Sequence, residues 1–174
     1  MKLIRFHVLA AIVAVPAATL VYAAISDVEV HCSPKRVDAS MPKNVGNDRT
    51  VSKEHWNYDV TVENKTFKSL AGIEVKYVIF YKTEELGSKE EPKTERVTGS
   101  NAIAELRPHE KKSFNTNSAE LNKSHLTGHW YYSGGERIKA EDTLIGAWFR
   151  VYQNGQQIAE YANPSTLITQ QKWE

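Results

Sequence analysis

Cysteine is almost absent from this sequence, because Cys32 is the only one among 174 residues. An intrachain disulfide is therefore excluded. A buried, unreactive thiol is the favoured interpretation, and an intermolecular pairing or a reactive thiol is the alternative. Stability must then come from a hydrophobic core, and a chain of this length has enough residues to bury one.

An excess of charge of either sign is also missing. The chain has 22 basic and 21 acidic residues, and 20 and 21 once Lys2 and Arg5 near its start are set aside. A general nucleic-acid-binding protein needs a basic surface that displaces counterions from phosphates. The composition therefore argues against a nucleic-acid partner, and it gives no reason to expect attraction to anionic lipid.

The sequence contains none of the common motifs of catalysis or cofactor binding. No Gly-x-Ser-x-Gly, phosphate loop or dinucleotide fingerprint occurs. Glu141 and Asp142 are adjacent, so on a strand they point to opposite faces and do not form a catalytic pair of carboxylates. We therefore expect no catalytic residue, no cofactor and no metal, and an enzyme is only a remote alternative.

Only one long apolar run is present, from Val8 to Ala24, and it follows two positive charges. This arrangement is typical of a signal peptide, and Val21-Tyr22-Ala23 suits cleavage after its last residue. An uncleaved membrane anchor is the alternative, because a run reaching Ile25 approaches the minimum of about 17–18 residues that span a bilayer. Residues 1–23 are thus predicted to be a signal peptide or anchor. The protein is predicted to be exported to the periplasm, the cell surface or the medium.

The rest of the chain has the pattern of β-strands. From Trp56 to Glu63 and from Ile73 to Tyr81, apolar and polar residues alternate, which indicates strands with one buried face. The second run becomes apolar on both faces toward its end, as in a central strand. Further strands are expected at Asp27–Cys32, Lys112–Asn117, Leu144–Tyr152 and Gln156–Tyr161, and Thr94–Leu106 is expected to form a pair of weaker strands with an interruption at Gly99.

The segments between these strands contain turn and loop signals. Asn154-Gly155 is the preferred pair for a type I′ turn and predicts a hairpin between the last two strands. The polar segment from Ser33 to Ser52 is predicted to be a long loop. Apolar residues with helical spacing are not sustained anywhere, so helix is expected for a turn or two at most, around Glu120 to His125.

About seven or eight short strands, spaced roughly 10 residues apart, predict an all-β fold. The expected architecture is an antiparallel β-sandwich of the immunoglobulin or fibronectin type III kind. Residues 24–52 would supply the first strand and the long loop, and residues 53–174 would form the sandwich core. Trp56 or Trp148 is expected to be the large aromatic side chain between the two sheets.

Parts of the sequence resemble bacterial extracytoplasmic immunoglobulin-like domains, including those of the FxLYD type. The matching residues are Val60-Thr61-Val62-Glu63-Asn64, Ile73-Glu74-Val75-Lys76-Tyr77, Phe80-Tyr81, and Leu106-x-Pro108-x-Glu110 followed by Phe114. His109 stands where that pattern has glycine, and Lys82 stands where it has an acidic residue. Gly146 to Tyr152 and Asn163-Pro164 resemble uncharacterised exported proteins of the Verrucomicrobia type. The resemblance implies a β-sandwich outside the cytoplasm that mediates binding or adhesion and has no catalytic residue.

The segment from Gly128 to Arg137 is the main candidate for a ligand site. Trp130, Tyr131 and Tyr132 form an aromatic run in a Gly-rich loop, and with Arg137 they offer flat rings and a charge to a sugar or peptide. The favoured interpretation is nevertheless structural, with alternate rings such as Trp130 and Tyr132 closing the open end of the sandwich.

Two other groups of side chains receive structural interpretations. His125 and His129 have the spacing of two zinc ligands, but Leu126 stands where a catalytic Glu would be, so surface histidines are favoured. Arg150 is expected to pack its stem on neighbouring aromatic rings on one face of its strand.

The sequence as a whole favours a non-catalytic binding module of the bacterial cell envelope. A protein partner or self-association through a sheet face or edge is the first hypothesis. A carbohydrate-binding module that uses the Trp130–Tyr132 loop is the alternative.

Overall fold

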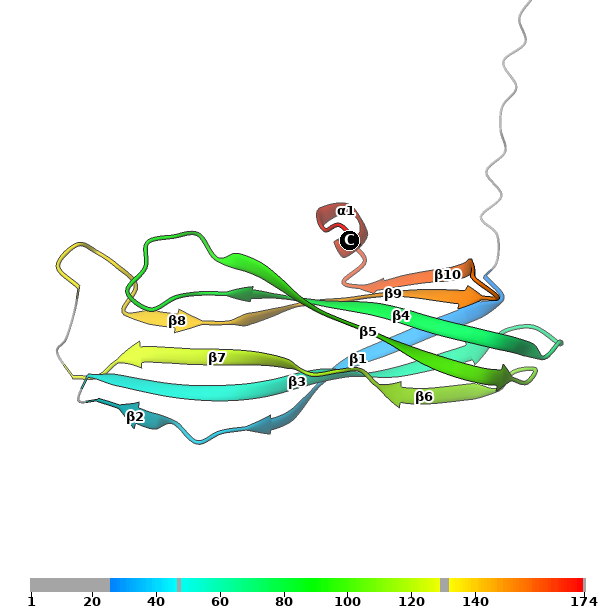
Figure 1. Ribbon diagram of the computed structural model, residues 1–174, viewed down its shortest axis with the longest axis horizontal. Helices are drawn as coiled ribbons and strands as arrows, with labels where there is room; N and C mark the ends of the chain where they lie inside the picture. Colours follow the sequence, from blue (N-terminus) through cyan, green and yellow to red (C-terminus); the bar gives the residue numbers. More distant parts are fainter. Residues whose placement is uncertain (1–25, 47, 129–131, 174) are drawn as a thin grey trace, which may run out of the picture.

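The computed structural model describes residues 26–46, 48–128 and 132–173. Two antiparallel sheets lie face to face (Figure 1), so the prediction of an all-β sandwich is confirmed. Ten strands are present in the described ranges, more than the seven or eight expected. The one helix in these ranges is α1 (Leu167–Gln170). No helix in the described part of the chain is both long and apolar enough to cross a bilayer.

The first sheet has four strands in the order β10 (Gln156–Asn163), β9 (Thr143–Gln153), β4 (Leu70–Thr83) and β5 (Lys93–Leu106). Strand β4 pairs with β9 on one side and with β5 on the other. Its segment from Tyr77 to Phe80 is buried on both faces, which confirms the prediction of a central strand.

The second sheet is built around the long strand β3 (Arg49–Asn64). On one side β3 pairs with β1 (Val28–Ala39) and β2 (Lys43–Val45), and on the other with β6 (Lys111–Asn115) and β7 (Ala119–Leu126). The short strand β8 (Lys139–Glu141) pairs with β7. Each long edge of β3 is thus covered by two strands in succession.

Three local predictions were wrong. The segment from Thr94 to Leu106 is not a pair of strands, because β5 continues through Gly99 and pairs with β4 there. The segment from Ser33 to Ser52 is not a long loop, because β1 continues to Ala39 and both β2 and the start of β3 lie within it. The segment from Glu120 to His125 is not helical but belongs to β7. In the outer half of β1, exposed side chains cover both faces, so alternation, the usual sequence signal of a strand, is missing there.

The main core lies between the two sheets and is centred on Phe149. This side chain is fully buried, and its ring centroid lies 6.4 Å from that of Tyr58 and 6.1 Å from that of Tyr77. Trp56 is only half-buried and donates its indole N–H to Glu54 at 2.9 Å. Trp148, the other candidate, belongs to a separate cluster outside this core. The expectation that a tryptophan fills the space between the sheets was therefore wrong.

A second, smaller apolar cluster covers the outer face of the four-stranded sheet. Trp148 belongs to it, because neighbouring residues on a strand point to opposite faces and Phe149 points inward. Leu167 of α1 is fully buried in the same cluster together with Val78 and Phe80. The C-terminal segment is thereby attached to this face, as Figure 1 shows above β9.

The hairpin between β9 and β10 has the predicted turn. Asn154 and Gly155 have φ angles of 51° and 83°, as a type I′ turn requires. Strands β8 and β9 are separated only by Asp142, and there the chain passes from one sheet to the other.

Candidate functional site

The loop predicted to bind ligand lies only partly in the described residues. Trp130 and Tyr131 lie outside them, as does His129 of the histidine pair. Tyr132 is half-buried, and its hydroxyl lies close to Gly87 of the β4–β5 loop. Arg137 donates to the carbonyl of Glu90 at 2.7 Å. Both side chains hold two loops together, which is a structural role, and the ligand-binding role of the loop stays a prediction.

Glu141 and Asp142 do not face each other as a catalytic pair would. Asp142 is buried and accepts backbone N–H groups of Asn122 at 2.8 Å and Glu84 at 3.1 Å. Glu141 forms ion pairs of 3.0 Å with both Lys123 and Lys139. Asp142 thus fixes the crossing of the chain between the sheets, and Glu141 links β8 to β7 on the surface through Lys123.

One cluster of metal-ligand types occurs among the described residues. The ligand atoms of Glu29, His31 and Glu63 lie within 4.8 Å of one another. However, the ammonium of Lys65 lies 2.9 Å from Glu29 and 3.3 Å from Glu63. The hydrogen bond to Glu29, followed by that to Glu63, raises the pKa of Lys65. Lys65 already supplies the positive charge that a metal would bring, so the cluster is best explained as a surface ion-pair network.

A mainly apolar hollow of the described surface lies where the two sheets meet along one side. Strands β1 and β10 are the edge strands of different sheets and do not pair with each other. Between them is a cleft of about 380 Å³, with Val28, Val30, Ala159 and Tyr161 among its lining residues. The Ser26 hydroxyl lies at the same place, 3.2 Å from the carbonyl of Ile158. Figure 1 shows these ends of β1 and β10 beside each other.

The edge strands differ in the features that prevent unwanted strand pairing. Charged residues, proline and bulges protect natural sheet edges. The outer half of β1 contains Pro34, Lys35 and Arg36, with a register shift after them, and the edge strand β5 contains lysine and arginine. Strand β10 has a register shift near its start but contains no lysine, arginine or proline, and its Glu160 pairs with Arg150 at 2.8 Å. The stretch from Ala159 onward is therefore the least protected edge.

Cys32 of β1 is half-buried and packs against the main core. Burial raises the pKa of its thiol to about 11, so almost no thiolate is present at neutral pH. This agrees with the interpretation of an unreactive thiol.

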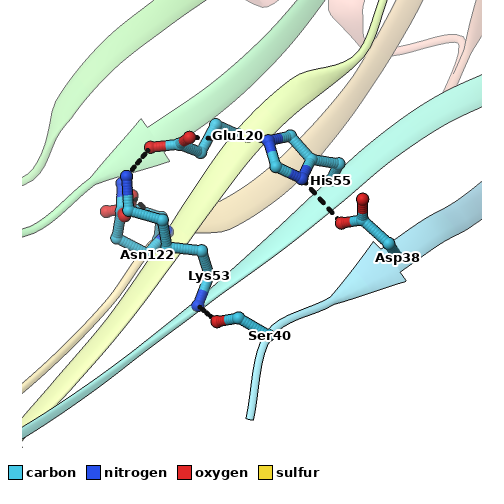
Figure 2. Close-up of polar contacts among 7 residues, drawn as sticks. Asp38, Ser40, Lys53, His55, Glu120 and Asn122 are labelled. Carbon is cyan, nitrogen blue, oxygen red and sulfur yellow. Dashed lines mark hydrogen bonds and ion pairs between the residues drawn. The ribbon is translucent and has the colours of Figure 1, made fainter. Parts of the chain in front are cut away.

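A polar cluster that sequence reasoning missed connects β1, β3 and β7 (Figure 2). His55 of β3 lies between two carboxylates, with Nδ1 2.6 Å from Asp38 and Nε2 3.4 Å from Glu120. The second oxygen of Glu120 lies 2.7 Å from the ammonium of Lys53. The hydrogen bond to Asp38 is the main cause that raises the pKa of His55. All four side chains are exposed or nearly so, and the cluster joins three strands of one sheet.

His55 should make the stability of the fold depend on pH. Its pKa is higher in the folded than in the unfolded chain, where it is near 6.5, so its contribution is fully present below that pH. The contribution is lost as pH rises through the folded pKa. We expect His55→Gln to lower the melting midpoint most at pH 5.5 and progressively less toward pH 8.5.

The control for this prediction is His125→Gln. His125 is exposed on β7 and has no ion pair among the described residues. Melting curves of both variants and the unchanged protein across this pH range test the prediction. An equal effect of His55→Gln at all pH values would contradict it.

The prediction that Arg150 packs on neighbouring aromatic rings is confirmed. Its guanidinium lies 4.9 Å from the ring centroid of Trp148 and 4.4 Å from that of Trp173. Glu160 accepts from both Arg150 and the indole N–H of Trp148. These contacts hold the end of the chain on the outer face of the four-stranded sheet.

No protein-family model and no curated protein matches this sequence. Among solved structures, it is similar to the structural-genomics target SoR45, with 10% identity, a TM-score of 0.38, and coverage of 78% of this chain and 85% of that one. The putative ApaA protein of Bordetella pertussis has 12% identity, a TM-score of 0.29, and coverage of 79% and 92%. A protein from Akkermansia muciniphila has 9% identity, a TM-score of 0.31, and coverage of 86% and 80%. These likenesses define neither a family nor a function.

Proposed function

We propose that this protein is an exported, non-catalytic binding module of the bacterial cell envelope that engages a protein partner along the edge strand β10. The exported, immunoglobulin-like identity implied by the sequence resemblance is part of the same proposal. The observation that carries it is the apolar cleft between the unpaired edges of β1 and β10. An extended segment that adds to a sheet edge gains main-chain hydrogen bonds, and a neighbouring apolar cleft accepts every second side chain.

An extended segment of a partner protein fits this place better than a compact ligand. The cleft runs beside the edge of β10 that pairs with no described strand, although the Ile158 carbonyl on this edge accepts from Ser26. Its lining is mainly apolar, with Val28, Val30 and Tyr161 contributing. Among its charged lining residues, Glu29 pairs with Lys65, and Glu160 pairs with Arg150. Such a surface favours an uncharged strand with apolar residues at alternate positions.

Site-specific photo-cross-linking tests the proposal in cells that express the full chain. A photoreactive phenylalanine derivative is placed at Gln157 or Ala159 of β10 and, as a control, at Ala104, which is exposed on the opposite edge strand β5. We expect adducts from both β10 positions and none from Ala104. A paired strand advances residue by residue, so the two adducts should map within about four residues of each other in one partner segment.

A charged substitution provides the matched control. Ala159→Lys introduces the kind of residue that blocks edge pairing, and it should remove most of the adduct formed from Gln157. Ala104→Lys places the same charge on β5 and should leave that adduct unchanged. Equal cross-linking from both edges, adducts in unrelated segments, or no adduct would contradict the proposal.

A further inference from the structure

The outer face of the four-stranded sheet carries a second hollow, away from the β1–β10 cleft. It is an open groove of about 670 Å³ between the C-terminal segment and strands β4 and β5. This volume falls within the roughly 300–1,000 Å³ of typical small-molecule sites. The lining side chains differ in kind from those of the cleft: they are Trp173, the charged residues Glu74, Lys76 and Arg96, and the hydroxyl-bearing Thr98 and Ser100.

Trp173 is held in place as a fixed wall of this groove. Its ring stacks on the Arg150 guanidinium at 4.4 Å and meets the Trp148 ring edge to face, with centroids 5.3 Å apart. Glu160 fixes Arg150 from the other side at 2.8 Å. A ring that is already ordered loses little entropy when a ligand binds to it. Apolar ring surfaces of this kind suit the C–H faces of sugars.

The charge of the groove is positive. Lys76 lies 3.7 Å from Glu74, so these two charges largely cancel. Arg96 is exposed on β5 and forms no ion pair with any described residue. Arg96 also lines a second hollow, together with Lys172 and Glu95. A free guanidinium at this position presents a planar fork of N–H donors, which matches a carboxylate.

From this combination we infer that the groove binds a saccharide that carries a carboxylate. In this site, Trp173 stacks against a sugar ring, Arg96 binds the carboxylate, and Thr98 and Ser100 hydrogen-bond to ring hydroxyls. The proposal is independent of strand addition at β10, because it uses other residues and another ligand. The groove also shares no residue with the predicted ligand loop, since neither Tyr132 nor Arg137 lines it.

Isothermal titration calorimetry of the purified full-length protein tests this inference with three probes. The first is a trisaccharide of galacturonic acid, the second is a neutral trisaccharide of galactose, and the third is a hexaglutamate peptide. We expect binding of the acidic saccharide alone, with an affinity that falls as sodium chloride is raised from 50 to 500 mM. Equal binding of the neutral sugar or of hexaglutamate would overturn the proposal, as would no binding of the acidic saccharide.

Two variants assign the binding to the groove. Arg96→Gln removes an exposed charge and should weaken binding about tenfold, since hydrogen bonds between charged groups contribute that much. Trp173→Ala should weaken it to a similar extent, but it also removes packing around Arg150, so its melting midpoint is measured as well. Lys43→Gln on β2 makes the same charge change on the other sheet and should leave binding unchanged. Unaltered binding by Arg96→Gln would overturn the inference by itself.

Discussion

Replacing Asn64 with alanine is expected to lower the free energy of unfolding by about 3 kcal/mol, because several buried polar groups lose their partner at once. Asn64 is fully buried at the end of β3. Its side-chain amide donates to three carbonyls, those of Lys68 at 2.8 Å and of Leu106 and Arg107 at 3.0 Å each. Its side-chain oxygen accepts the backbone N–H of Thr66 at 2.9 Å.

Urea denaturation of Asn64→Ala measures this loss. The matched control is Asn115→Ala on β6, where the asparagine is exposed and has no side-chain hydrogen bond among the described residues. A surface change of this type should stay within about 0.5 kcal/mol. Similar values for the two variants would show that the network around Asn64 contributes little.

The hydrogen bonds of Asn64 also give a physical reason for the Val-x-Asn motif at the end of β3. Val62-Glu63-Asn64 was noted only as part of a resemblance, in which a strand ends in Val-x-Asn before a polar turn. In the fold, this asparagine joins the turn after β3 to the turn between β5 and β6. A residue that connects two turns about 40 positions apart cannot be interpreted from its neighbours in sequence alone.

His109 is a second motif position whose usual residue, glycine, is explained by the backbone conformation in the fold. It stands where the resembling domains have glycine, and its φ angle is 57°. This left-handed conformation costs most residues about 1–2 kcal/mol and costs glycine little. The edge-to-face contact with Phe67, with centroids 4.8 Å apart, provides a partial compensation in this chain.

The sequence predicted those strands that bury one face or both. Alternation identified the core halves of β3 and β4, and Asn154-Gly155 identified the final hairpin. The outer half of β1 was missed because its side chains are exposed on both faces, and most of β7 was missed because half-buried side chains follow Leu121 in place of alternation. Pairing with β3 rather than burial keeps these segments extended. Hydrophobic periodicity reports which side chains are buried, so it cannot predict a strand that is held only by backbone pairing.

The candidate sites depend even more on long-range contacts. The cleft unites Ser26 with Ile158, which are 132 positions apart. The saccharide groove unites Trp173 with Arg96 and Lys76. Neither set forms a local motif, so composition and spacing pointed instead to the aromatic loop around Tyr132. Only the packing of the two sheets and the attachment of α1 to the outer face bring these residues together.

Phe149→Ala is expected to have the largest effect of any single truncation, about 4 kcal/mol of unfolding free energy. The ring is fully buried between the sheets and lies near three tyrosines, with centroid distances of 6.4 Å to Tyr58, 6.1 Å to Tyr77 and 6.5 Å to Tyr161. Removing it leaves a cavity that strands of both sheets cannot close, since each is fixed by its own ladder of hydrogen bonds.

The position of Phe149 makes the same variant informative about function. Tyr161, one of its three neighbours, also lines the β1–β10 cleft, so a cavity behind it should loosen the cleft wall and reduce cross-linking from Gln157. Met41→Ala is the control, because Met41 is 84% exposed and its truncation should change the unfolding free energy by no more than about 0.5 kcal/mol. Urea denaturation compares the two. A loss below 1 kcal/mol for Phe149→Ala would mean that the sheets are not held together at this ring.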